Sequence, residues 1–77
     1  MKEFFEVLAF QRTKQKNQPH LMERRTFISL AQAMTIAQKW ARIYHRVEVL
    51  DTFTDDDEFW VESDELIHCW ENGVKTL

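Results

Sequence analysis

Residues 29–45 read SLAQAMTIAQKWARIYH, and this stretch decides the fold of the chain. Laid out at the period of an α-helix, its apolar side chains gather on one broad arc and its polar side chains fill the other side. Ser29 is a favourable N-cap residue, and Gln32 three positions later completes a capping box. The sequence therefore predicts an amphipathic helix over residues 30–45 with one face toward a core. The predicted core face consists of Leu30, Ala33, Met34, Ile36, Ala37, Trp40, Ala41, Ile43 and Tyr44.

Apolar and aromatic segments of strand length lie on both sides of this helix. Two of them precede it, and the polar loop between them contains Pro19, which cannot donate a hydrogen bond to a sheet ladder. Two more follow it, with the acidic residues 55–57 between them as a turn. The predicted strands are residues 4–10, 21–28, 47–53 and 59–62.

The C-terminal segment permits two interpretations. A turn at residues 63–65 would lead into a strand over residues 66–71, which ends at Asn72 and Gly73, a pair typical of a two-residue hairpin turn. Alternatively, Asp64 would cap a short helix that ends at Gly73. We favour the strand, because residues 63–65 suit a turn between neighbouring strands.

These elements predict an α+β fold, in which a mostly antiparallel sheet of four to five strands carries the amphipathic helix on one face. The length of 77 residues suits a single domain over residues 1–77. Cys69 is the only cysteine, so no intrachain disulfide can form and a cytoplasmic location is favoured. The N-terminal residues do not resemble a secretion signal, and no apolar run approaches the roughly 18 residues that span a membrane.

The sequence offers no pattern that is typical of catalysis or of a metal site. Zinc ligands usually come at paired spacings, which His20, His45, His68 and Cys69 do not show. His68 and Cys69 are adjacent and would point to opposite faces of a strand, so we expect Cys69 to be a small buried apolar residue. A single glycine excludes a glycine-rich phosphate loop. We therefore expect a binding protein rather than an enzyme, with no metal and no cofactor.

The charge of the chain is divided between its two halves. Residues 1–46 carry a formal charge of +6 and residues 47–77 one of −9, for a net charge of −3. Long cations on a loop suit contacts with phosphates, and an acidic turn beside aromatic residues suits docking on a basic groove. Both runs are also typical of plain solvated turns. The candidate basic surface consists of Arg12, Lys14, Lys16, Arg24 and Arg25, and the candidate acidic and aromatic surface of Asp55, Asp56, Asp57, Glu58, Trp60 and Glu62.

Three segments carry a resemblance to a known family. They are the helix start S-L-A-Q-A-x-x-I-A at residues 29–37, the strand V-x-V-x-D-T at residues 47–52, and F-W-V at residues 59–61, with Trp70 further on. Together they resemble the small β-β-α-β-β proteins of phages and mobile elements, in particular one group of type I-F anti-CRISPR proteins. The resemblance implies a stoichiometric inhibitor that docks on a CRISPR surveillance complex where guide or target nucleic acid would run. No contact residue of that family is carried over.

We therefore expect a non-enzymatic, phage-type inhibitor that binds a host CRISPR effector complex in the host cytoplasm and blocks target binding. One alternative is a nucleic-acid-binding module that uses the basic loop, whose affinity would fall steeply with salt. A second alternative is a small structural phage protein that forms a homodimer through a sheet edge or an uncovered face. No membrane partner is expected.

Overall fold

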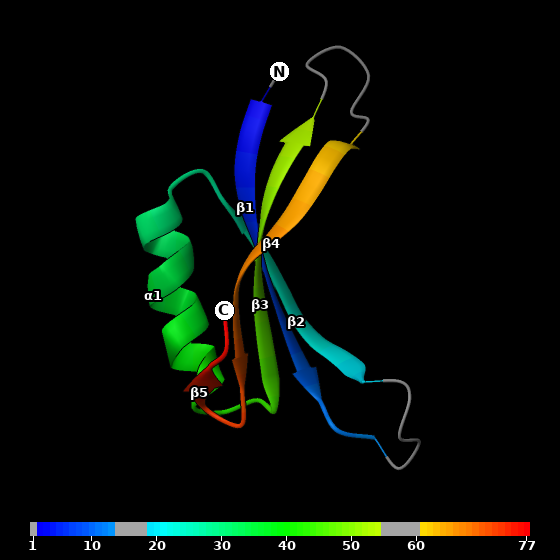
Figure 1. Cartoon of the computed structure of the whole chain (residues 1–77), viewed down its shortest axis with the longest axis vertical. Coiled ribbons are helices and arrows are strands. Elements are labelled where there is room, and N and C mark those ends of the chain that lie inside the picture. Colours follow the sequence, from blue (N-terminus) through cyan, green and yellow to red (C-terminus); the bar gives the residue numbers. More distant parts are fainter. Residues whose placement is uncertain (1, 14–18, 55–60) are drawn as a thin grey trace.

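The computed structural model describes residues 2–13, 19–54 and 61–77, and these residues form one helix on a five-stranded antiparallel sheet (Figure 1). The spatial order of the strands is β2-β1-β3-β4-β5. The elements are β1 (Lys2–Gln11), β2 (His20–Phe27), α1 (Leu30–Ala41), β3 (Arg46–Thr54), β4 (Val61–Glu71) and β5 (Val74–Lys75). This arrangement confirms the predicted α+β fold. Within the described residues, no helix has the length and apolar character needed to cross a membrane.

The core lies between α1 and the central strands of the sheet. Residues that pair across antiparallel strands share a face, and Val49 pairs with Val7 of β1 while Val47 pairs with Ala9. Val47 also pairs with Trp70 of β4, which extends the same face by one more strand. All five side chains are buried and belong to one apolar cluster with the helix.

The helix meets this face through a stripe of alanines. Ala33, Ala37 and Ala41 follow each other at four-residue spacing and are all buried. Their short side chains let the helix backbone approach the sheet closely, while larger side chains pack around the edge of the contact. The partly buried members of this rim are Phe5, Phe27, Met34, Trp40, Tyr44 and Ile67.

The helix is shorter than predicted, because it ends at Ala41 rather than at residue 45. The N–H groups of Ile43 and Tyr44 both donate to the Trp40 carbonyl, which closes the last turn and leads the chain toward β3. Ile43 therefore leaves the predicted core face, and 59% of its surface is exposed. At the other end Ser29 has the extended backbone of an N-cap, but its side chain makes no capping hydrogen bond, so the predicted capping box is not formed.

The predicted turn at residues 63–65 is wrong, since β4 runs through this segment without a break. Ser63, Asp64 and Glu65 pair with consecutive residues of β3, so this segment belongs to the ladder. The register shift opposite Val49 and Leu50 accommodates one extra residue of β4 as a bulge. The predicted turn at residues 55–57 lies outside the described residues.

The hairpin interpretation of the C-terminal segment is confirmed, and the helical one is wrong. Asn72 and Gly73 have φ angles of 53° and 81°, and they connect β4 to β5 as a two-residue turn. Both central residues of a type I′ turn need positive φ, which asparagine tolerates and glycine favours. Beyond β5, the Cys69 N–H donates to the Leu77 carbonyl at 3.1 Å, so the last residues also lie along β4.

We predict that Ala37→Leu destabilises the protein by about 1–3 kcal/mol, because Ala37 is fully buried between helix and sheet and a larger side chain overpacks the contact. Urea unfolding followed by circular dichroism measures the change. Gln38→Leu introduces the same side chain at the neighbouring exposed position and is the matched control. Equal unfolding midpoints for the two variants would contradict the close contact.

We predict that Gly73→Ala costs about 1–2 kcal/mol, because the left-handed backbone at φ 81° disfavours any L side chain. The added Cβ itself finds room, since its nearest neighbour is the Ala41 carbonyl oxygen at 3.7 Å. Thermal unfolding measures the loss. Asn72→Gly keeps positive φ available and is expected to retain the hairpin, so a larger loss in that variant would argue against the turn geometry.

Candidate functional site

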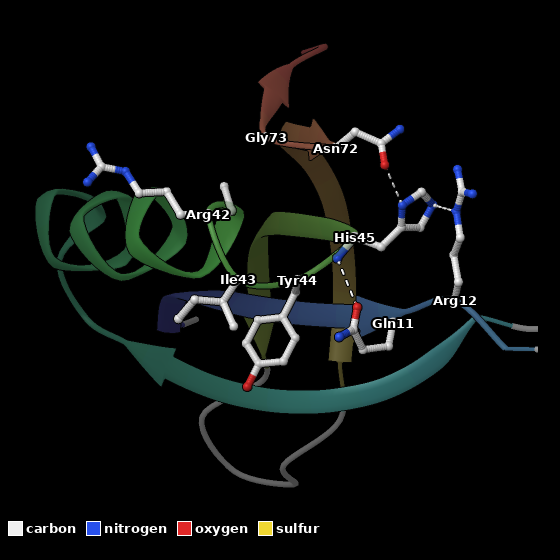
Figure 2. Close-up of a pocket in the computed structure, with 9 residues that line it drawn as sticks. Gln11, Arg12, Arg42, Ile43, Tyr44, His45, Asn72 and Gly73 are labelled. Atoms are coloured by element: carbon white, nitrogen blue, oxygen red, sulfur yellow. Dashed lines mark hydrogen bonds between the residues drawn. The ribbon is translucent and has the colours of Figure 1, made fainter.

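An open hollow of about 600 Å³ lies at the C-terminal end of α1, where three separate parts of the chain meet (Figure 2). One part is the end of β1, the second is the turn that follows α1, and the third is the turn between β4 and β5. The hollow is lined by Gln11, Arg12, Ala41, Arg42, Ile43, Tyr44, His45, Asn72 and Gly73.

His45 is the centre of a hydrogen-bond network that joins these three parts (Figure 2). Its backbone N–H donates to Gln11 Oε1 at 3.2 Å, and its backbone carbonyl accepts the N–H of Asn72 at 2.8 Å. Its ring contacts Asn72 Oδ1 through Nδ1 at 2.8 Å and Arg12 Nε through Nε2 at 3.4 Å. The imidazole therefore couples the end of β1 to the β4–β5 turn.

The chemistry of the partners assigns the proton on the His45 ring. Arginine has no acceptor, so Nε2 must accept from Arg12 and carries no proton. The remaining ring proton of the neutral imidazole is then on Nδ1, which donates to Asn72 Oδ1. Both side-chain amides thus face His45 with their oxygens, and the NH₂ groups of Gln11 and Asn72 remain as outward donors.

The hollow is electropositive. Arg12 and Arg42 line it together with His45, and the described part of its lining includes no aspartate and no glutamate. Two carboxylates on neighbouring elements are already engaged, since Glu71 pairs with Arg46 and Glu23 accepts the hydroxyl proton of Tyr44 at 3.3 Å. An anion in this hollow would meet the donors and cations of these side chains, and also the C-terminal end of α1, whose carbonyl groups carry partial negative charge.

The structure places the three described members of the predicted basic surface apart from one another. Arg24 and Arg25 are consecutive on β2, opposite Leu8 and Val7, and therefore point to opposite faces of the sheet. Arg24 forms an ion pair with Glu6 on the face away from α1. Arg12 lies at the hollow instead. Lys14 and Lys16 lie outside the described residues.

The predicted acidic and aromatic surface falls mostly on residues that the structure does not describe. Asp55, Asp56, Asp57, Glu58 and Trp60 lie outside the described residues, and Glu62 belongs to β4 with its side chain undescribed.

An acidic group does lie on the strand ends that lead to this segment. Asp51 pairs with Glu65 across β3 and β4, and Glu3 of β1 is a hydrogen-bonding neighbour of Asp51. The pKa of Glu3 is raised by this hydrogen bond, with smaller contributions from partial burial and from the negative charge of Asp51. Glu3, Asp51 and Glu65 therefore place negative charge at this end of the sheet.

Among the described residues, no group of three or more His, Cys, Asp or Glu side chains is arranged to hold a metal ion. Cys69 is 3% exposed, which confirms the prediction that it is a buried residue. It pairs with Glu48 while His68 pairs with Val49, so the two neighbours face opposite sides of β4.

Comparison with profiles of known protein families, with characterised proteins and with solved structures finds no match. The anti-CRISPR resemblance therefore rests on the three sequence segments alone.

Sequence reasoning missed the central residues of the hollow. The predicted helix ends at His45, and Gln11 lies between the predicted strand over residues 4–10 and the polar loop that follows it. Only the Asn72-Gly73 turn left a recognisable signal. Nothing in the sequence indicates that this turn contacts His45, which lies 27 residues earlier and forms two hydrogen bonds with Asn72.

Tyr44 provides a spectroscopic probe of the hollow, because it is the only tyrosine. Its pKa is raised above the ordinary 10.0, chiefly by burial and then by the charge and hydrogen bond of Glu23. We predict that tyrosinate absorbance in Glu23→Gln develops at lower pH than in the wild type. Because the folded state favours the protonated hydroxyl, Tyr44 contributes to the stability of the fold below pH 10.0. This contribution is lost as the pH rises through the raised pKa of Tyr44. Identical titration curves would exclude the contact with Glu23.

Proposed function

We propose that the protein is a non-enzymatic, phage-type inhibitor that binds a host CRISPR effector complex and blocks its binding of target nucleic acid. The observation that carries the proposal is the separation of charge along β1. Lys2 of β1 pairs with Thr54, next to the acidic run at residues 55–58, whereas Gln11 pairs with His20, next to the lysines at residues 14 and 16. The two charged segments are thus attached at opposite ends of a ten-residue strand.

A strand of this length places the two attachment points about 30 Å apart. Charges of opposite sign at that separation give the protein an electric dipole. A dipole supports docking in a single orientation on a charged partner. The acidic end would face the basic groove in which an effector complex holds nucleic acid. Glu3 and Asp51 support this role, since they add negative charge on the strands at the same end.

The face of the sheet opposite α1 offers a second contact area. Leu8, Leu50 and Leu66 share this face and are half-buried. Ion pairs lie beside them, from Arg24 to Glu6 and from Arg46 to Glu48, the latter at 2.7 Å. Apolar residues surrounded by polar and charged residues are typical of a protein-binding surface.

The proposal predicts a stoichiometric complex between this protein and a type I or type II CRISPR effector, with loss of target-DNA binding by that effector. Pull-down with purified effectors, followed by a target-DNA binding assay, measures both. The absence of a complex with every type I and type II effector would overturn the proposal.

Two charge-neutralising variants distinguish the ends of the molecule. The acidic variant combines Asp55→Asn, Asp56→Asn and Asp57→Asn, and we expect it to weaken inhibition at least about tenfold, since each charge pair at an interface can contribute more than 1 kcal/mol. The matched basic variant combines Lys14→Gln and Lys16→Gln and is expected to retain inhibition. The reverse result would place the docking surface at the basic end.

A further inference from the structure

We propose that the hollow at the end of α1 binds a phosphate group, either free or within a nucleic-acid backbone, through the guanidinium of Arg12 and the side-chain amide of Asn72. This inference is independent of the proposed inhibitor function, because it concerns different residues at the other end of β1 from the acidic run.

The network around His45 orients the donors. Asn72 must present Oδ1 to the ring, so its Nδ2 carries two N–H groups that point away from His45. Arg12 uses Nε for the ring, and within the described residues neither of its terminal Nη nitrogens has an acceptor. Both donors lie beside the imidazole in Figure 2, whereas the guanidinium of Arg42 extends away from it. Arg12 and Asn72 are therefore the contact residues, and Arg42 adds positive charge at the rim.

The site is held in place before a ligand arrives. Asn72 is fixed by the left-handed turn at φ 53° and by its backbone hydrogen bond to the His45 carbonyl at 2.8 Å. Arg12 follows directly on the end of β1, and its Nε contact with His45 directs the guanidinium toward the hollow. Preorganised donors lose less conformational entropy on binding than free side chains do.

The arrangement favours phosphate over a carboxylate. The two Nη groups of a guanidinium match two oxygens of an oxyanion, and the amide of Asn72 supplies a third donor from another direction. A tetrahedral phosphate has oxygens for all three, whereas a carboxylate has two oxygens in one plane. Among the residues that the structure describes, no carboxylate lines the hollow to repel the ligand.

A titration with inorganic phosphate tests the site. In ¹⁵N-labelled protein at low salt, we expect saturable shifts of the Asn72 side-chain NH₂ signals and of the His45 ring nitrogens at millimolar phosphate. The free protein is expected to show the His45 tautomer with the proton on Nδ1. Absence of saturable shifts in the wild type, or the opposite tautomer, would overturn the proposal.

Three variants assign the binding to these residues. Arg12→Gln removes a charge-assisted contact and is expected to weaken binding about tenfold or more. Asn72→Asp keeps a residue that tolerates the left-handed turn but adds a negative charge, and it is expected to abolish binding. Arg25→Gln removes the same charge as Arg12→Gln at a position outside the hollow and is expected to bind as the wild type does. An equal loss in Arg25→Gln and Arg12→Gln would show general charge attraction and overturn the site.

A single-stranded oligonucleotide distinguishes the two sources of phosphate. If the ligand is a nucleic-acid backbone, the oligonucleotide shifts the same Asn72 and His45 signals at a lower concentration than phosphate does, and Arg12→Gln weakens both ligands. If the ligand is a free phosphate, inorganic phosphate is the tighter of the two. Failure of both titrations would remove this site and leave the effector pull-down unaffected.

Discussion

The close contact between the alanine stripe of α1 and the valines of β1 and β3 is the constraint on which the rest of the structure depends. Ala37 faces a surface made by residues such as Val7 and Val49, all of them fully buried. A domain of this size can bury only a limited apolar area. The small alanine side chains bring the helix backbone near the sheet, so that little of this area is left without contact. The larger rim residues, such as Trp40, then shield the contact from solvent; the Trp40 ring meets that of Tyr44 edge to face at 6.3 Å between centroids.

This contact also determines where the helix must end. The Ala41 carbonyl oxygen lies 3.7 Å from the position that a Cβ on Gly73 would take, so the end of α1 and the β4–β5 turn approach each other closely. A helix that continued to residue 45 would run past the sheet instead of turning into β3. The chain turns at once, and His45 enters the space between β1 and the C-terminal turn. The electropositive hollow is thus a consequence of the helix packing.

Charge is distributed in three ways in this small protein. On the sheet face away from α1, Arg46 is paired with both Glu48 and Glu71, so that its positive charge is balanced within the strands and one negative charge remains. At one end of the sheet, Glu3 and Asp51 form a negative group. At the other end, Arg12 belongs to a site whose described lining contains no carboxylate side chain. The antiparallel pairing of β1 with β3 places Glu3 and Asp51 toward one end of the sheet and Gln11, which precedes Arg12, toward the other.

The sequence by itself determined the α+β class, the existence of the amphipathic helix, the buried state of Cys69 and the hairpin turn at Asn72, because each follows from a local period or a local backbone preference. It did not determine that β4 continues through residues 63–65, since the polar residues there are held by pairing with β3. Only the tertiary structure decided the end of the helix and the composition of the hollow. The apolar periodicity continues through Tyr44. It does not indicate that His45 forms hydrogen bonds with Asn72, in a turn 27 positions later. Contacts of that kind depend on the distance between elements, which packing sets and a local pattern does not record.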